Sequence, residues 1–483
     1  MSNLSIMMKK ALSVMLLISI SLNLSGCAML QSPSSLMYSP DTYIEGESSQ
    51  EIKSLLNKYN YVITSPVTGE EKRSIIKTNL NGDASEEILI IYKKANEDAI
   101  YGFLILAKVN ESLKIICNET FQCKNIYSLS YADMDNDENK EILITTSSVD
   151  NDTKTLNIYK FIGKTTVKLF SKSCSDFKMF SKDSSTTKPY IILIEDDVKS
   201  HNKTLCMYQW KNNSMERVDS TDFDVKVKDA IIKVGKYDHD NLGVFCTYNY
   251  NSEFIYSDVY TINKGQLSKI TPSISNNASE ANRFVYPIKH YLNLLGKSDT
   301  SINLNDFIID VDNDGIYEFR MPQMIGNKKE DLHKNNIDYW YKLSDLTEAK
   351  KGKIESSGNM SKISYYDILD NYTLFLPGKY FSDSTLSILS NVKEQSNTND
   401  FYISHGGTES KWIFSITVYE KLPDGYTYPP NSNYSVFMSD YGNKIFAITY
   451  VNDFFKAKGL SDTDMKNDFF VFDVGFPWSK ASF

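Results

Sequence analysis

Short runs of β-branched and aromatic residues recur along the chain and are separated by polar turns. Four such runs are Ile88–Tyr92, Ile142–Thr146, Tyr190–Ile194 and Val244–Thr247. Runs of this length, bounded by turn-forming residues, are typical of strands. Long stretches with a 3.6-residue apolar period are missing, and the clearest helical pattern lies at Glu280–Leu295. The pattern therefore predicts a mainly β protein.

Acidic segments come directly before several of these runs. Asn79–Glu87, Asp133–Glu141 and Asp310–Glu318 align without gaps, and each continues at once into an apolar run. Oxygen-bearing side chains occupy positions 1, 3, 5 and 9 of each segment. These candidate metal ligands are Asn79, Asn81, Asp83 and Glu87 in the first loop, Asp133, Asp135, Asp137 and Glu141 in the second, and Asp310, Asp312, Asp314 and Glu318 in the third.

The acidic segments recur at a regular spacing. Weaker copies contain Asp238 and Asp240, or a Ser/Thr-rich stretch after Lys182, and they also precede apolar runs. The first positions then fall near residues 79, 133, 182, 236 and 310. Most steps are roughly 50 to 55 residues, and such a period usually means one supersecondary unit per step. A four-stranded propeller blade is the unit that fits.

Alternate carboxylates on a tight loop suit calcium, which takes six to eight oxygen ligands in a tolerant shell. Only the third loop has the full pattern, because Gly315 at position 6 permits the sharp turn. Glu138 replaces that glycine in the second loop, so we expect strain there, and the neutral asparagines of the first loop should weaken binding. An EF-hand is excluded, because its position 12 requires glutamate and these loops have Ile90, Ile144 and Met321 there.

The three loops resemble the calcium loops of FG-GAP or VCBS-type repeats in integrin-like β-propellers, in which D-x-D-x-D-G-x-x-E precedes an apolar strand. The chain also resembles uncharacterised lipoproteins of low-GC, clostridial-type Gram-positive bacteria. That likeness includes Ile63–Pro66, Tyr339–Tyr341 and Tyr372–Pro377, in this order along the chain. The resemblance implies a β-propeller-like domain of about five to seven blades and a calcium role, and it implies no catalytic residues.

The amino terminus has the pattern of an export signal. Lys9 and Lys10 precede an apolar run from Ala11 to Leu24, which is too short to span a bilayer as a helix. The run ends in Leu24-Ser-Gly-Cys27, which resembles a bacterial lipobox. We expect residues 1–26 to be removed, Cys27 to carry the lipid that anchors the protein to the membrane, and residues 27–50 to form a flexible tether. The predicted location is the extracytoplasmic face of the cell membrane.

Residues 51–360 are predicted to form the propeller-like domain and residues 361–483 an α+β domain with an antiparallel sheet. Strands are expected at Tyr372–Pro377, Lys411–Tyr419 and Lys444–Tyr450, and a short helix at 451–459.

The net charge of −9 argues against nucleic acid as a partner. Five further cysteines could pair outside the cell, although buried free thiols are the simpler interpretation. They are Cys117, Cys123, Cys174, Cys206 and Cys246.

No common catalytic motif is present, since HExxH, G-x-S-x-G, Walker and dinucleotide-binding patterns are all missing. The leading hypothesis is a non-enzymatic binding or scaffold module for an envelope protein or polysaccharide. The alternative is an extracellular hydrolase or lyase that cleaves wall material or polysaccharide with a pair of carboxylates, whose spacing the sequence does not give. A third hypothesis is a chaperone or sensor subunit with a membrane partner.

Overall fold

The structure is a computed structural model, and it describes residues 47–451, with gaps, and 469–471. The gaps are residues 70, 84, 111, 151–152, 182–187, 197–201, 224, 251, 273–283, 295–301, 323–336, 349–359, 368–369, 371, 379–384, 394–395, 405–409, 420–424, 426–431 and 439–443. The chain forms two compact units that divide mainly at residue 168. In the part that the structure describes, no helix is long and apolar enough to cross a membrane.

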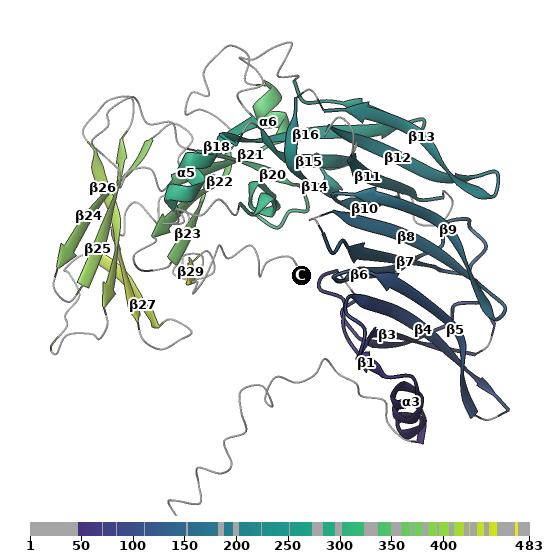
Figure 1. The fold of residues 1–483 in the computed structure, drawn as a ribbon. Coiled ribbons are helices and arrows are strands. Elements are labelled where there is room, and N and C mark those ends of the chain that lie inside the picture. Colours follow the sequence, from purple (N-terminus) through teal and green to yellow (C-terminus); the bar gives the residue numbers. More distant parts are fainter. Residues whose placement is uncertain are drawn as a thin grey trace, which may run out of the picture. The chain divides into compact units, whose positions relative to one another are not determined.

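The first unit begins with a helix and an antiparallel sheet. Helix α3 (Glu47–Lys58) lies beside the strands of this sheet (Figure 1). The sheet consists of β1 (Tyr61–Ile63), β2 (Ile75–Thr78), β3 (Glu87–Lys94), β4 (Ile100–Val109) and β5 (Ser112–Gln122). The next sheet consists of β6 (Asn125–Ala132), β7 (Glu141–Ser147), β8 (Lys154–Ile162) and β9 (Thr165–Cys174), paired in this order.

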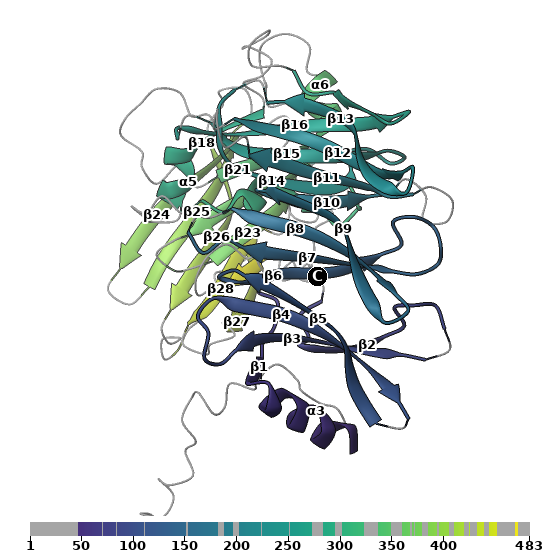
Figure 2. The same ribbon diagram turned by 45° about the vertical axis from the view of Figure 1, so that its right-hand side comes forward.

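Two further sheets of the same kind open the second unit and lie side by side (Figure 2). The first consists of β10 (Phe177–Phe180), β11 (Tyr190–Asp196), β12 (Lys203–Lys211) and β13 (Ser214–Asp222). The second consists of β14 (Val227–Lys236), β15 (Leu242–Tyr250), β16 (Phe254–Asn263) and β17 (Gln266–Lys269), with β18 (Val285–Pro287) paired to β16. Helix α5 (Ile288–Leu294) follows, inside the stretch that the sequence predicts to be helical.

The rest of the second unit contains two larger antiparallel sheets. A 3-10 helix, η3 (Leu304–Phe307), leads into β19 (Ile308–Ile309), β20 (Glu318–Pro322), β21 (Ile337–Lys342), β22 (Met360–Asp367) and β23 (Tyr372–Pro377), with β29 (Phe469–Val471) at the edge. Helix α6 (Leu343–Glu348) follows β21. The last sheet has the order β24 (Thr385–Lys393), β25 (Ser396–Ser404), β26 (Lys411–Tyr419), β28 (Ile445–Val451) and β27 (Ser432–Met438).

Strands β3, β7, β11 and β15 are inner strands of their sheets and are buried along most of their length, so both of their faces are covered. In the first unit, Leu89 and Ile91 of β3 pack towards Ile142 and Ile144 of β7. The alternate residues of β3 pack on the opposite side with Ile52 and Leu56 of α3. This double burial explains why these strands are continuous apolar runs rather than alternating ones. The prediction of a mainly β fold built from antiparallel sheets is confirmed, whereas ring closure into a propeller stays a prediction.

The carboxy-terminal strands differ in one respect from the predicted organisation. Strands β22 and β23 extend the sheet that contains β20, so this sheet continues across residue 361, where the sequence places a domain boundary. Strand pairing joins these segments because Ile363 and Tyr365 enter the same hydrophobic core as Phe319 and Met321. The helix expected at 451–459 lies outside the described residues, apart from Val451 in β28. Cys117 and Cys123 are free thiols.

Candidate metal centre

The third acidic loop joins β19 to β20 in a tight hairpin. Asn313 and Gly315 take the left-handed conformation, with φ of 59° and 86°. The backbone N–H groups of Asp314 and Gly315 donate to the Asp310 carboxylate at 3.1 and 2.9 Å. The N–H of Ile316 donates to Asp314 Oδ1 at 2.9 Å. Alternate left-handed residues therefore fold the loop around the carboxylates of its own side chains, and Gly315 meets the need that the sequence predicts.

Three carboxylates of this loop converge. Asp310, Asp312 and Glu318 each place an oxygen within 4.8 Å of the others. Glu318 is fully buried, and its two oxygens accept the N–H of Val311 at 3.0 Å and the hydroxyl of Ser361 at 3.1 Å. Burial, reinforced by the charge of Asp312, raises the pKa of Glu318 to about 8. A buried carboxylate of this kind requires a positive partner to be stable when ionised.

A lysine from the next strand enters the cluster. Lys342 ends β21 directly opposite Glu318, and its ammonium pairs with Asp314 Oδ2. The same nitrogen lies 3.6 Å from Asp312 Oδ2 and 3.9 Å from Glu318 Oε1. Asp314, which the sequence predicts as a metal ligand, is therefore bound to an ammonium rather than grouped with the other three carboxylates. The sequence pattern did not predict the part that Lys342 plays.

The loop also joins two sheets of the second unit. Ile316 forms an isolated parallel bridge with Lys236 at the end of β14, and the Tyr317 N–H donates to the Lys236 carbonyl at 3.0 Å. The Tyr317 ring lies against Gly235, where an added Cβ would come within 2.5 Å of it. The ammonium of Lys233 donates to the carbonyl of Ile308 at 2.6 Å. The conformation of the loop thus determines how β19 meets β14.

The second loop has the same local form. Asp133, Asp135 and Glu141 place oxygens within 4.8 Å of one another, and Glu141 is fully buried. The N–H of Asp137 donates to Asp133 Oδ1 at 3.2 Å. Glu138 has a φ of 70°, so the strain expected from the missing glycine is confirmed. Lys160 of β8 lies 3.4 Å from Glu141 Oε1. The sequence pattern did not predict this lysine either.

The first loop is closed by its own amides. Asn81 Nδ2 donates to Asp83 Oδ2 at 2.9 Å and to Glu87 Oε1 at 3.0 Å. Asn79 Oδ1 accepts the Gly82 N–H at 2.8 Å, and Glu87 Oε2 accepts the Leu80 N–H at 2.9 Å. The described residues of this loop contain no group of three acidic ligands. The two asparagines therefore take the positions that carboxylates hold in the other loops.

The weaker copies show less. Asp238 accepts hydrogen bonds from the backbone N–H groups of Asp240 and Asn241 at 2.9 and 2.7 Å, so its turn is closed internally. The Ser/Thr-rich stretch at 182–187 and the predicted lipid site Cys27 both lie outside the described residues.

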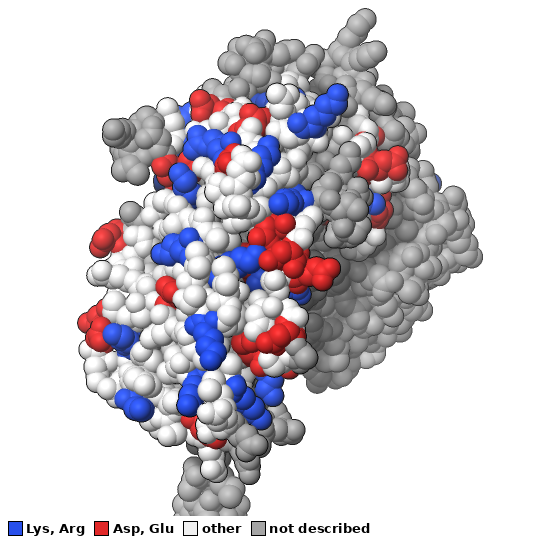
Figure 3. Space-filling view, turned by 90° about the vertical axis from the view of Figure 1, so that its right-hand side faces the viewer, with Lys and Arg blue, Asp and Glu red and all other residues white. Residues whose placement is uncertain are grey.

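On the face shown in Figure 3, basic and acidic side chains are interspersed among the coloured residues, without an extended basic surface.

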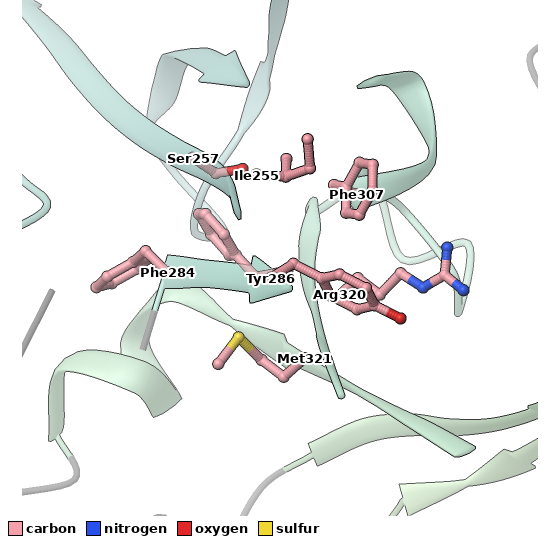
Figure 4. A pocket seen from close by; sticks show the side chains of 8 residues that line it. Ile255, Ser257, Phe284, Tyr286, Phe307, Arg320 and Met321 are labelled. Carbon is pink, nitrogen blue, oxygen red and sulfur yellow. The ribbon is translucent and has the colours of Figure 1, made fainter. Parts of the chain in front are cut away.

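A buried ion pair follows the third loop along the same sheet. Arg320 Nε and Asp338 Oδ2 are 2.6 Å apart, and both side chains are fully buried. The guanidinium lies 4.9 Å from the ring centroid of Tyr366 and 5.2 Å from that of Tyr286. Arg320 and Phe307 both line a small cavity, and the guanidinium lies at the same end of it as Phe307 (Figure 4). This cavity has room for about one water molecule, so the group is part of the core rather than a ligand site.

Comparisons with known proteins give little further information. No protein-family model and no curated protein matches the chain. Among solved structures, the chain is similar to the exotype rhamnogalacturonan lyase YesX, with 8% identity and a TM-score of 0.28. It is also similar to the Bacillus licheniformis rhamnogalacturonan lyase PL11, with 9% identity and a TM-score of 0.31. Each match covers 80% of this chain and 91% of the other chain. TM-scores this low carry no argument about function.

Proposed function

We propose that the second and third acidic loops bind calcium, and that the ion stabilises the junctions between neighbouring sheets of an envelope protein. The observation that carries this proposal is the convergence of Asp310, Asp312 and Glu318 within 4.8 Å around a fully buried carboxylate. A divalent ion would supply the positive charge that the buried glutamate requires.

The donor chemistry favours calcium over other metals. Both candidate groups consist of carboxylate oxygens, without the histidine or cysteine ligands that zinc prefers. Calcium accepts irregular shells of six to eight oxygens, and backbone carbonyls and water can complete them, whereas magnesium demands a near-ideal octahedron. A hairpin loop whose carboxylates are already held by its own N–H groups is a suitable partner for the more tolerant ion.

Calcium titration of the purified full chain tests this proposal. Extracellular calcium sites typically have dissociation constants of about 0.1 to 1 mM, so 10 mM calcium should stabilise an occupied site by about 1 to 3 kcal/mol. We expect the melting temperature to rise with calcium and to fall with a chelator. Asp312→Asn should remove the contribution of the third loop. Asp238→Asn is the matched control, because its turn is closed by Asn241. An unchanged calcium response in Asp312→Asn would overturn the assignment for the third loop.

We further propose that the four-stranded sheets are blades of a propeller and that lipid on Cys27 anchors the protein outside the cell membrane. The support is the antiparallel order of β6–β9, β10–β13 and β14–β17, together with the lipobox-like sequence. Metabolic labelling with a fatty acid, lost in Cys27→Ala, tests the anchor. Retained labelling in that variant would place the lipid elsewhere.

The role of the body at the envelope has two candidate forms. The first is a non-enzymatic binding module, and the alternative is an enzyme that acts on polysaccharide. We keep both proposals, because the similarity to solved structures is too low to decide. Incubating the full chain with a panel of purified wall and plant polysaccharides separates them. New reducing ends without new ultraviolet absorbance indicate a hydrolase, new reducing ends together with ultraviolet absorbance from unsaturated ends indicate a lyase, and binding without products indicates a module.

A further inference from the structure

Lys342 lies where strand β21 ends and helix α6 begins, so its backbone position is well defined. It is the last residue of β21, where it pairs with Glu318 of β20, and helix α6 begins at the next residue. Its side chain is only 22% exposed. The ammonium therefore reaches the carboxylates of Asp312, Asp314 and Glu318 from a strand position that the sheet determines. This position is the one that a bound cation would share.

Among the described residues of the three loops, a lysine of the following strand lies beside the loop only where the loop has carboxylates at all four ligand positions. The second loop, with three aspartates and Glu141, also receives a lysine from the following strand, Lys160. The first loop has neutral asparagines at positions 1 and 3, and Ile88 of β3 pairs with Leu106 of β4. Continuing that register places Ala107 at the position that corresponds to Lys342. Lysine is thus present beside the two loops with four carboxylates at the ligand positions, and alanine replaces it beside the loop with only two.

We propose that Lys342 is a built-in competitor of the divalent ion, which lowers the calcium affinity of the third loop and holds the loop together when calcium is scarce. This inference rests on the proposed calcium function of the same loop. An ammonium and a divalent ion cannot both lie among these carboxylates without strong repulsion, so metal entry requires the lysine to leave. The ion pair with Asp314 must break for that exchange, and Asp314 then becomes available to the ion.

The competition lowers the calcium affinity that the sequence of the third loop suggests. The third loop matches the calcium pattern best, but its lysine contacts Asp314 and lies within 4 Å of two more carboxylates. Lys160 lies 3.4 Å from Glu141. The calcium affinity of the third loop should therefore be lower than its match to the calcium pattern suggests.

Lys342→Met tests the proposal, because methionine keeps the length of the side chain and removes its charge. The measurement is calcium titration by calorimetry and melting temperature, on the full chain with Asp135→Asn present so that the second loop does not contribute. We expect calcium to bind about tenfold more tightly, since breaking one ion pair before metal entry is worth on the order of a tenfold change in affinity. Lys342→Gln provides a second uncharged variant. Lys211→Met, which removes an exposed charge from β12, is the control for net charge.

The melting temperatures distinguish competition from a purely structural lysine. Under competition, Lys342→Met melts below the unsubstituted protein in chelator, and this difference disappears in saturating calcium, because the ion has then displaced the lysine from the carboxylates. A structural lysine lowers the melting temperature under both conditions, and that result overturns the proposal. Equal calcium affinity with and without Lys342 also overturns it, while the calcium site itself stands. If neither protein binds calcium in the third loop, the proposed function fails, and with it this inference.

Discussion

Asp306 should make the stability of this protein depend on pH in a way that a single substitution removes. The carboxylate lies in η3, is 2% exposed, and accepts hydrogen bonds from Tyr291 Oη at 2.6 Å and Asn303 Nδ2 at 2.9 Å. Burial raises its pKa from 3.8 to about 6, although Tyr291, Arg320 and Lys233 all favour the charged form. Burial is the larger effect, so the folded protein holds this proton more tightly than the unfolded chain.

The sign and size follow from that difference. Below pH 3.8 the carboxyl is protonated in both states, and its contribution to stability is fully present. Between pH 4 and 6 the unfolded chain loses the proton first, so the free energy of unfolding falls as pH rises. A shift of roughly two units corresponds to about 3 kcal/mol. In Asp306→Asn the amide stays neutral, so this dependence disappears.

Urea unfolding of both proteins between pH 4 and 7 measures the effect. The free energy of unfolding of Asp306→Asn, relative to the unsubstituted protein, should rise by about 2 kcal/mol between pH 4 and 7 and level off near pH 7, the rest of the total of about 3 kcal/mol falling below pH 4. A difference that stays constant across this range would show that burial does not control Asp306. A difference that falls with pH would show that the cations Arg320 and Lys233 outweigh burial.

Single contacts give three further predictions. Gly315→Ala should destabilise the protein by about 1 kcal/mol and Glu138→Gly should stabilise it by a similar amount, because both positions have positive φ. An added Cβ at Gly315 meets no atom within 4 Å, so only the backbone conformation contributes there. The urea midpoints of the two variants should shift by equal and opposite amounts, and shifts of the same sign would contradict this prediction. Asp338→Asn should cost about 3 to 5 kcal/mol in urea unfolding, since it leaves the buried charge of Arg320 without its partner, and a cost below about 1 kcal/mol would refute this. Among the five described thiols, only Cys117 is partly exposed and should react with a thiol reagent in the folded protein, whereas rapid labelling of several would indicate open cores.

Local sequence signals predicted the loops and most of the strands around them. An apolar run bounded by Asp, Asn and Gly is a short-range pattern, and it located β3, β7, β11 and β15 as well as the turns before β3, β7 and β15. Strand β26 has the predicted bounds, Lys411–Tyr419. The left-handed conformation at position 6 was also predictable, since the spacing of the carboxylates requires it.

The lysines beside the loops could not be predicted in the same way. Lys342 meets Glu318 only because β20 and β21 pair in one register, and residues 323–336 separate the two strands. A shift of one residue would turn the lysine to the other face of the sheet. Sequence spacing across such a connection does not determine register. The only available signal was that a lysine ends the run Tyr339-Trp-Tyr-Lys342, which follows the third loop and its apolar run along the chain.

The first loop offers a direct test of how buried charge and lysine together control metal affinity. Asn79→Asp with Asn81→Asp would give it carboxylates at positions 1, 3, 5 and 9, and Ala107 occupies the position of the competing lysine. Without metal, the aspartate introduced in place of Asn81 would face Asp83 and Glu87, where the native amide now donates to both, so the variant should be less stable in chelator. Calcium should more than restore that stability, and calorimetry should show one additional site that binds more tightly than the third loop.

Adding Ala107→Lys should weaken the new site about tenfold, since the same kind of ion pair must then break before metal entry. An additional site that binds no more tightly than the third loop, or that is indifferent to Ala107→Lys, would show that the lysine does not control affinity.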